Sequence, residues 1–257
     1  MTPPAAKRVS LLQHHALEHG QIRMIPKKIH YVWVGSPEPD RIRRYIDSWS
    51  ATNPDYEIIR WNEENIDFSI PAIQNAYNRR LWSKVSDIAR LMAVLDQGGI
   101  YLDTDFSIRR SLDLLLKHNC FFAFQRVDHP TDWVANGVFG ATPGHWFIRQ
   151  ALDRILGLRA LPFGFERPTR TGPKLITSLL LQNGLKAYHP DGVYVRDIYL
   201  CPVPVFFPFF LGETFTEACV RKETIGIHFW EKSWEKDLPR YIRLAKAIKH
   251  QIAGTRL

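Results

Sequence analysis

The stretch SDIARLMAVLDQGGIYLDTDF, from Ser86 to Phe106, decides the fold class of this chain. Residues 83–97 carry apolar side chains at helical spacing, and the pair Gly98-Gly99 supplies the left-handed backbone at which a helix stops. Residues 100–102 (IYL) are apolar and lead into turn residues, which predicts a short buried strand. The stretch therefore predicts a helix that folds back onto a strand, with two aspartates at the carboxyl end of that strand.

The sequence on both sides of this stretch alternates strand-like and helix-like segments. Residues 28–34 (KIHYVWV) predict a buried first strand, and residues 42–49 have apolar residues at helical spacing before a second strand at 56–61. Further strands are expected at 120–125, 136–141, 193–199 and 224–229, and helices at 145–156 and 174–181. This alternation predicts an α/β fold with a mostly parallel central sheet flanked by helices, whose ligands bind beyond the carboxyl ends of the strands.

With 257 residues, 45% of them hydrophobic, the chain is long enough for one sizeable core. We expect a loosely ordered leader at residues 1–23, a catalytic domain at 24–237 and a basic amphipathic helix at 238–257. No run approaches the roughly 18 apolar residues of a membrane-spanning helix, and the first residues lack the apolar run of a signal peptide. A cytoplasmic protein is therefore expected, with the closing helix able to rest on the inner face of an anionic membrane.

The net charge of +8 favours polyanionic partners. The basic residues are dispersed, with no Arg/Lys run interleaved with aromatic residues and no zinc-finger or helix-turn-helix pattern, which argues against nucleic acid. A diphosphate-bearing ligand or an anionic membrane surface fits this charge better. The three cysteines, Cys120, Cys201 and Cys219, form no metal-type cluster and are expected to be reduced packing residues.

The motif Asp103-Thr104-Asp105 places two carboxylates two residues apart after the apolar strand. That spacing lets both approach one ion, and carboxylate oxygens suit hard cations such as Mg²⁺ and Mn²⁺, which bridge phosphate oxygens. A divalent cation would neutralise the charge that grows on a departing nucleoside diphosphate. The alternative for an isolated Asp-x-Asp is ordinary turn chemistry at a strand end.

Four segments of the chain together resemble a known enzyme family. They are residues 86–106, residues 25–35 (IPKKIHYVWVG), Thr171-Gly172-Pro173 and residues 227–234 (IHFWEKSW). They resemble glycosyltransferases with a sugar-binding region containing a DXD motif, a group similar to glycosyltransferase family 32. That group includes yeast mannosyltransferases and bacterial capsular polysaccharide transferases, and more distantly it is similar to the catalytic domain of clostridial glucosylating toxins. The resemblance implies a GT-A fold, a nucleotide-sugar donor, Mn²⁺ or Mg²⁺, and anomeric retention.

The resemblance also assigns roles to polar residues. Asp103 would address the ribose or sugar of the donor, and Asp105 would bind the metal. Asp87 and Arg90 stand three residues apart on one helical face. Asp87 would hold sugar hydroxyls, and Arg90 the sugar or the diphosphate. Without the family, the two are equally well an exposed intrahelical ion pair.

Three aromatic residues match donor-contacting positions of the family. Trp33 would stack on the nucleotide base, a contact worth about 1–3 kcal/mol, and we count the adjacent Val32 with it. The alternative for Trp33 is core packing. Tyr101 would contact the donor unless it only packs in the core, and Trp234 would close over the donor and exclude water.

The resemblance places further residues at the metal and at the acceptor. His228 is the candidate third metal ligand, with Ser233 as its rival, and an imidazole suits Mn²⁺ better than Mg²⁺. The alternative for His228 is a structural role. Asn136 would lie beside the transferred sugar. Gly172 would belong to a loop at the acceptor mouth, or simply to the turn before a helix that begins with Pro173.

The favoured function is transfer of a hexose, from a UDP-sugar, to a glycan or lipid-linked acceptor in polysaccharide synthesis such as that of a capsule. A protein acceptor is the nearest alternative. Two others are a haloacid-dehalogenase-like phosphotransferase, because residues 103–107 come close to the pattern D-x-D-x-[TV], and a sugar-binding relic without turnover. The sequence leaves the donor base, the sugar, the linkage and the acceptor open.

Overall fold

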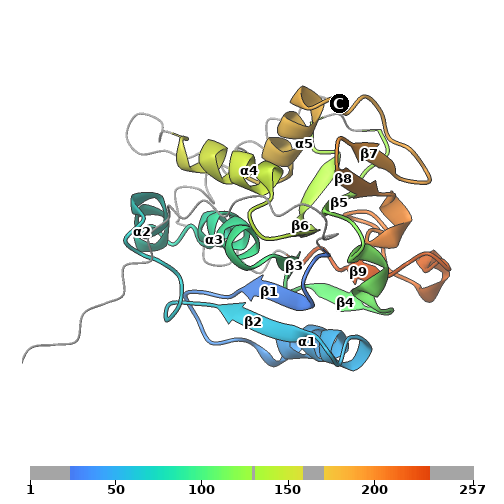
Figure 1. The fold of residues 1–257 in the computed structure, drawn as a ribbon. Helices are drawn as coiled ribbons and strands as arrows, with labels where there is room; N and C mark the ends of the chain where they lie inside the picture. The colour runs from blue at the N-terminus through green and yellow to red at the C-terminus, as the bar shows by residue number, and fades with distance from the viewer. Residues whose placement is uncertain (1–23, 129–130, 159–170, 232–257) are drawn as a thin grey trace, which may run out of the picture.

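The structure is a computed structural model that describes residues 24–128, 131–158 and 171–231. The expected leader and the expected closing helix lie outside these residues, so both stay predictions. Between them, strands and helices alternate along the chain, as Figure 1 shows.

A seven-stranded sheet forms the centre of the fold. Its strands are β1 Lys28–Val32, β2 Glu57–Trp61, β3 Gly99–Leu102, β5 Cys120–Phe124, β6 Val134–Ala141, β7 Val193–Val195 and β8 Ile198–Cys201. Their order across the sheet is β2-β1-β3-β6-β5-β8-β7. β1 pairs in parallel with β2 and β3, β5 pairs in parallel with β8, and both β3 and β5 run antiparallel to β6. All strands except β6 and β7 thus share one direction, and the expected mostly parallel sheet is confirmed.

A second, two-stranded sheet pairs β4, Phe106–Ile108, with β9, Gly226–His228. The two strands run antiparallel, and Phe106 lies opposite His228. β4 was not expected, because three residues give no periodicity to read, and β9 is shorter than the expected strand at 224–229. This ribbon brings the Asp-x-Asp motif next to a segment that lies far along the chain.

Within the described residues, the α-helices are α1 Asp40–Thr52, α2 Pro71–Asn78, α3 Trp82–Gln97, α4 Trp146–Leu156 and α5 Pro173–Gln182. α3 packs on β1, β3 and β6, α4 packs on α3, and α5 packs on β6, whereas α1 contacts β4. Figure 1 shows α3, α4 and α5 together on one side and α1 at the opposite end. α2 was not expected from the sequence. In the part of the chain that the structure describes, no helix has both the length and the apolar character needed to cross a membrane.

The expected single strand at 193–199 is wrong. β7 and β8 form an antiparallel hairpin there, with Val195 opposite Ile198. Arg196 lies in the turn with φ of 58°, a left-handed conformation that a non-glycine residue rarely adopts. The turn carries no Gly, Asn or Pro, and its one turn-forming residue, Asp197, was not enough to mark the break between the two strands.

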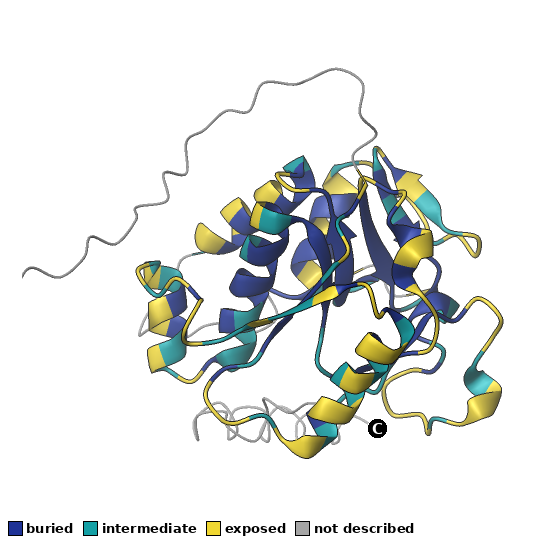
Figure 2. Ribbon diagram, turned by 60° about the horizontal axis from the view of Figure 1, so that its bottom comes forward, coloured by how far each residue is buried: buried dark blue, intermediate teal, exposed yellow. Residues whose placement is uncertain are grey.

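The glycine pair between α3 and β3 acts as predicted. α3 ends at Gln97, and Gly98 and Gly99 have φ of 64° and 100°. A side chain on Gly98 would also lie 2.6 Å from the ring of Pro143. The chain therefore reverses within two residues, and the first turns of α3 lie level with the carboxyl end of β3. Figure 2 shows the buried residues gathered on the sheet and on the inward faces of the helices.

Candidate active site

A cavity of about 480 Å³ lies at the carboxyl ends of β1 and β3, where α3 begins. Its walls come from the loop after β1, the first turns of α3, the Asp103-Thr104-Asp105 motif, β6, the start of α5 and residues 228–231. The volume falls in the range of small-molecule sites, roughly 300–1,000 Å³. The cavity lies at the edge of the sheet where the strand pattern places a ligand.

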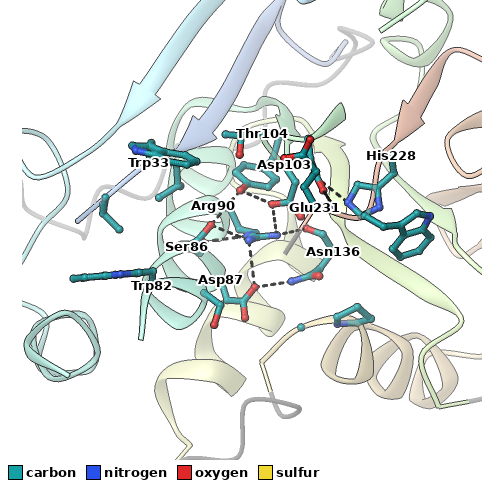
Figure 3. Close-up of a pocket in the computed structure, with 18 of the residues that line it drawn as sticks. Trp33, Trp82, Ser86, Asp87, Arg90, Asp103, Thr104, Asn136, His228 and Glu231 are labelled. Carbon is teal, nitrogen blue, oxygen red and sulfur yellow. Dashed lines mark hydrogen bonds and ion pairs between the residues drawn. The ribbon is translucent and has the colours of Figure 1, made fainter. Parts of the chain in front are cut away.

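Asp87 and Arg90 lie on the face of α3 that points into the cavity (Figure 3). Their side chains are only 9% and 7% exposed, and Asp87 Oδ1 lies 3.4 Å from Arg90 Nη2. The alternative of an exposed intrahelical ion pair is therefore wrong. Buried charges persist only when they are paired and hydrogen-bonded, so the surroundings of both groups decide what they can do.

The guanidinium of Arg90 is the centre of a polar cluster, and Figure 3 shows its contacts fanning out from it. Nε and Nη2 donate to the backbone oxygen and the hydroxyl of Ser86, at 3.1 and 2.8 Å. Nη1 donates to the backbone oxygen of Asn136 at 2.8 Å and lies 3.2 Å from Asp103 Oδ1. The group also lies over the ring of Tyr101, 4.4 Å from its centroid. Burial lowers the pKa of Arg90, but the groups around it, Asp103 first and then Tyr101 and Asp87, together outweigh burial and raise the pKa above its ordinary value.

Two neutral donors complete the surroundings of Asp87. Asn136 Nδ2 donates to Oδ1 at 2.7 Å, and Thr171 Oγ1 donates to Oδ2 at 2.6 Å. Burial raises the pKa of Asp87, and the opposing effects of Arg90 and Thr171 do not cancel the rise. Asn136 and Gly172, the two residues expected on the acceptor side, both line the cavity. Asn136 thus joins β6 to α3 at the cavity wall.

Asp103 is held at the end of β3 by several contacts. The hydroxyl of Tyr101 donates to Oδ1 at 2.9 Å, and Arg90 approaches the same oxygen. The backbone N–H of Asp103 donates to the backbone oxygen of Gly137 at 2.7 Å. Tyr101 is 1% exposed, so its ring packs in the core while its hydroxyl reaches the site. The carboxylate of Asp103 therefore has a fixed orientation before any ligand binds.

Asp105 and His228 face each other across the β4–β9 ribbon. His228 Nε2 lies 3.1 Å from Asp105 Oδ1, and Asp105 Oδ2 accepts the backbone N–H of Glu231 at 2.7 Å. The imidazole is enclosed by Phe106 and Trp230, with ring centroids 4.6 and 4.5 Å away. Burial lowers the pKa of His228, but the charge of Asp105 and the contact with it outweigh burial and raise the pKa.

Asp103, Asp105 and His228 could hold a divalent metal ion. Their ligand atoms all lie within 4.8 Å of one another, and the buried Nδ1 of His228 has no hydrogen-bond partner among the described residues. Two carboxylates and an imidazole suit Mn²⁺. Of the described lining residues, Asp87, Asp103, Asp105 and Glu231 are carboxylates, against two guanidinium groups. A diphosphate would therefore meet net negative charge unless a cation accompanied it.

Two indole rings line the side of the cavity next to β1 (Figure 3). Trp33 and the preceding Val32 were expected there, and the Nε1 of Trp33 donates to the backbone oxygen of Ser36 at 2.7 Å. Trp82, the first residue of α3, was missed, because a tryptophan at a helix start looks like any packing residue. Gly35 has φ of 86°, and a side chain there would lie 2.7 Å from the Trp82 ring, so the loop crosses this indole closely.

Arg41 and Glu231 also line the cavity and were not singled out from the sequence. Arg41 Nη1 lies 3.0 Å from Glu231 Oε2, and Tyr45 Oη donates to Glu231 Oε1 at 2.8 Å. Arg41 stands among other arginines on an amphipathic helix, so no local pattern marks it. Ser233 and Trp234 lie outside the described residues, and their expected roles stay predictions.

Comparison with known proteins shows what this chain is similar to. Residues 39–122 match the family described as "Glycosyltransferase sugar-binding region containing DXD motif". The chain is 28% identical over 236 residues to inositol phosphoceramide mannosyltransferase 3 of Schizosaccharomyces pombe, and this alignment covers 87% of this chain and 65% of that protein. It is 30% identical over 138 residues to mannosyl phosphorylinositol ceramide synthase SUR1 of Saccharomyces cerevisiae, and this alignment covers 52% of this chain and 35% of that protein.

A solved structure supports the fold. The PaToxG glycosyltransferase matches with a TM-score of 0.50 at 19% sequence identity, over 62% of this chain and 70% of that chain. The expected resemblance to DXD-motif glycosyltransferases and the expected fold are therefore confirmed. The chain spans less than two thirds of the length of the two yeast proteins.

Proposed function

We propose that this chain, which carries the DXD-containing sugar-binding region of glycosyltransferases at residues 39–122, transfers a hexose from a nucleotide-sugar to a glycan or lipid-linked acceptor with the help of a divalent metal ion. The matched region and the fold support glycosyl transfer. They weaken the phosphotransferase alternative, whose motif stands near the start of its fold, whereas here β1, α1, β2, α2 and α3 precede it.

One observation carries the proposal. Asp103 and Asp105 at the end of β3 meet His228 of β9 in the wall of a cavity large enough for a nucleotide-sugar. The three side chains come from segments that lie far apart in the sequence and that the β4–β9 ribbon brings together. Two carboxylates and an imidazole around one point are chemically suited to a divalent ion that binds a diphosphate.

The polar residues of the cavity have distinct parts in this proposal. Asp87 and Asp103, whose orientations are fixed by hydrogen bonds, would accept bonds from hydroxyls of the donor sugar or ribose. The base would stack on Trp33. A metal ion at Asp105 and His228 would supply positive charge next to the leaving diphosphate. For a retaining transfer, an oxygen of that diphosphate can take the proton of the acceptor hydroxyl, so no separate base is required.

The relatives refine the choice of donor and acceptor. The names of the yeast relatives specify mannosyl transfer to inositol phosphoceramide. Mannose therefore joins the candidate sugars, and a lipid-linked acceptor gains support over a capsular polysaccharide. The UDP-sugar expected from the sequence stays a prediction that a donor panel must decide. Contact of residues 238–257 with an anionic membrane likewise stays a prediction.

Donor cleavage tests the proposal directly. The purified chain is incubated with Mn²⁺, Mg²⁺ or EDTA and a panel of UDP- and GDP-sugars that includes GDP-mannose, and the released nucleoside diphosphate is measured. We expect slow hydrolysis of one donor that requires metal. Asp105→Asn should lower this rate by at least about 100-fold, because it removes a charged group that holds the cation.

Asp96→Asn is the matched control, because Asp96 is an exposed residue at the opposite end of α3. It should retain the wild-type rate. Cleavage that survives EDTA, or an Asp105→Asn protein as active as the control, would contradict metal-dependent transfer. If no donor is bound or cleaved with any metal, the sugar-binding relic becomes the better interpretation.

A further inference from the structure

The two guanidinium groups of the cavity differ in how far the protein already occupies them. Arg90 directs Nε, Nη1 and Nη2 to oxygen atoms of Ser86, Asn136, Asp103 and Asp87, and its side chain is 7% exposed. These contacts account for the five N–H groups of the side chain. Arg90 would have to break this cluster to bind the sugar or the diphosphate, the role expected for it from the sequence, whereas in the structure its contacts position the two aspartates.

Arg41 is placed differently. Its side chain is 38% exposed, it lines the cavity, and among the described residues its one partner is Glu231, at 3.0 Å. A guanidinium matches the geometry of phosphate oxygens and forms two parallel hydrogen bonds with them. Arg41 can therefore meet an anionic ligand by exchanging a single ion pair, without disturbing the cluster around Arg90.

We infer that Arg41 binds the diphosphate of the nucleotide-sugar and that Glu231 occupies the guanidinium until the ligand arrives. The assignment rests on the proposed function, since a nucleoside diphosphate must be the ligand. Glu231 is itself held in place, because Tyr45 donates to its other carboxylate oxygen and its backbone N–H donates to Asp105. After Arg41 moves to the diphosphate, Glu231 keeps the hydrogen bond from Tyr45.

The exchange also fits the charges of the cavity. The carboxylates of the lining outnumber its guanidinium groups, and Arg90 is neutralised by Asp87 and Asp103. Arg41 is then the positive side chain left for a diphosphate among the described lining residues. Its position on the first turn of α1 places it beyond β1, on the side where Trp33 also lines the cavity.

Binding measurements with matched ligands test this assignment. Calorimetry with Mn²⁺ present compares UDP with uridine, and GDP with guanosine, on the full chain. We expect Arg41→Gln to reduce the ratio of diphosphate affinity to nucleoside affinity about 10- to 100-fold, the range of a charge-assisted hydrogen bond. Arg41→Lys should give an intermediate ratio, because it keeps the charge and loses the paired geometry.

Arg43→Gln is the control on the same helix, because Arg43 is exposed and its ion pair is with Asp40 rather than with the cavity. It should keep the wild-type ratio. Glu231→Gln should raise the ratio severalfold by removing the competing charge, a gain that misfolding cannot produce. A fall in that variant would overturn the exchange.

The outcomes separate this assignment from the proposed function. If the wild-type chain binds UDP or GDP and Arg41→Gln leaves the ratio unchanged, the assignment alone is overturned. If Arg41→Gln weakens nucleoside and diphosphate equally, the residue acts on the shape of the cavity and the assignment is again overturned. If the wild-type chain binds neither diphosphate with Mn²⁺, the proposed function fails and the assignment fails with it.

Discussion

Gly137 shows how closely a neighbouring backbone approaches the acidic motif. Its carbonyl oxygen accepts the N–H of Asp103, and a Cβ built on Gly137 would overlap Asp103 Oδ2. The other carboxylate oxygen is held by Tyr101 and Arg90. The orientation of Asp103 therefore depends on the absence of a side chain at Gly137 as well as on the residues that form hydrogen bonds with it.

Gly137→Ala should impair the site more than the fold. The added methyl meets a carboxylate, which can rotate away, so we expect a stability loss of about 1–3 kcal/mol. We expect metal-dependent donor cleavage to fall at least about tenfold, because Asp103 loses its position. Thermal unfolding and cleavage rates measured on the same preparation check this, and a variant with wild-type cleavage would show that Asp103 tolerates the shift.

Residue chemistry was visible in the sequence where it followed a strong local pattern. Asp103 and Asp105 stand at the end of an apolar strand, and Asp87 and Arg90 share a helical face, so spacing showed that each pair acts together while the family resemblance supplied their roles. Spacing could not show that Arg90 is fully occupied, because Asn136 reaches it only through the pairing of β3 with β6. The ligand-binding capacity of a side chain depends on such distant partners.

At the scale of elements, the β4–β9 ribbon brings together the three candidate metal ligands. Phe106 pairs with His228 directly after the motif, and the backbone oxygen of Asp105 accepts the N–H of Phe229. Ile227, opposite Ser107, is fully buried and anchors β9. The position of the imidazole therefore follows the packing of β9.

Ile227→Ala should weaken metal binding as well as stability. Loss of a fully buried isoleucine costs about 2–5 kcal/mol, and relaxation of β9 would move His228. We expect Mn²⁺ affinity, measured by electron paramagnetic resonance, to fall about tenfold, as it does when groups that support a ligand are removed. Ile198→Ala, equally buried but in β8, should lose similar stability and keep the Mn²⁺ affinity. Equal affinities in the two variants would contradict the role given to the ribbon.

The elements that could be predicted from the sequence depend on residues close together in the chain, whereas the elements that were missed depend on distant partners or on an unusual turn. α3, Gly98-Gly99 and β3 were predicted because helix periodicity, a left-handed stop and an apolar strand lie within one short stretch. β4 is three residues long and exists because β9, far along the chain, pairs with it. The β7–β8 hairpin was merged into one strand because Arg196, not a glycine, makes its turn.

For the molecule as a whole, buried histidines make stability sensitive to acid. Burial lowers the pKa of His30, His118 and His145, and the charge of Lys117 lowers that of His118 further, to about 4. The ring of His118 stacks on Tyr199 and its Nδ1 lies 2.7 Å from Tyr194 Oη. His118 thus ties the segment before β5 to the β7–β8 hairpin in its neutral form.

The stability from His118 should be complete above its unfolded pKa of about 6.5 and should decline as the pH falls towards about 4. Below pH 6.5 the unfolded chain takes up a proton that the folded chain does not, so we expect a loss of about 2–3 kcal/mol between pH 7.5 and 4.5 from this residue. Urea unfolding at both pH values should show a smaller loss in His118→Gln. His189→Gln, at an exposed position nearby, should behave like the wild type; equal losses in all three proteins would contradict this assignment.

The late position of β9 also sets the order in which the protein gains its chemistry during translation. The ribosome makes the chain from its amino terminus, and early segments begin to fold as they emerge. A nascent chain that has passed β8 presents both aspartates but not His228. Premature capture of a metal ion by an incomplete chain is thereby disfavoured, since the third candidate ligand emerges only with the last described strand.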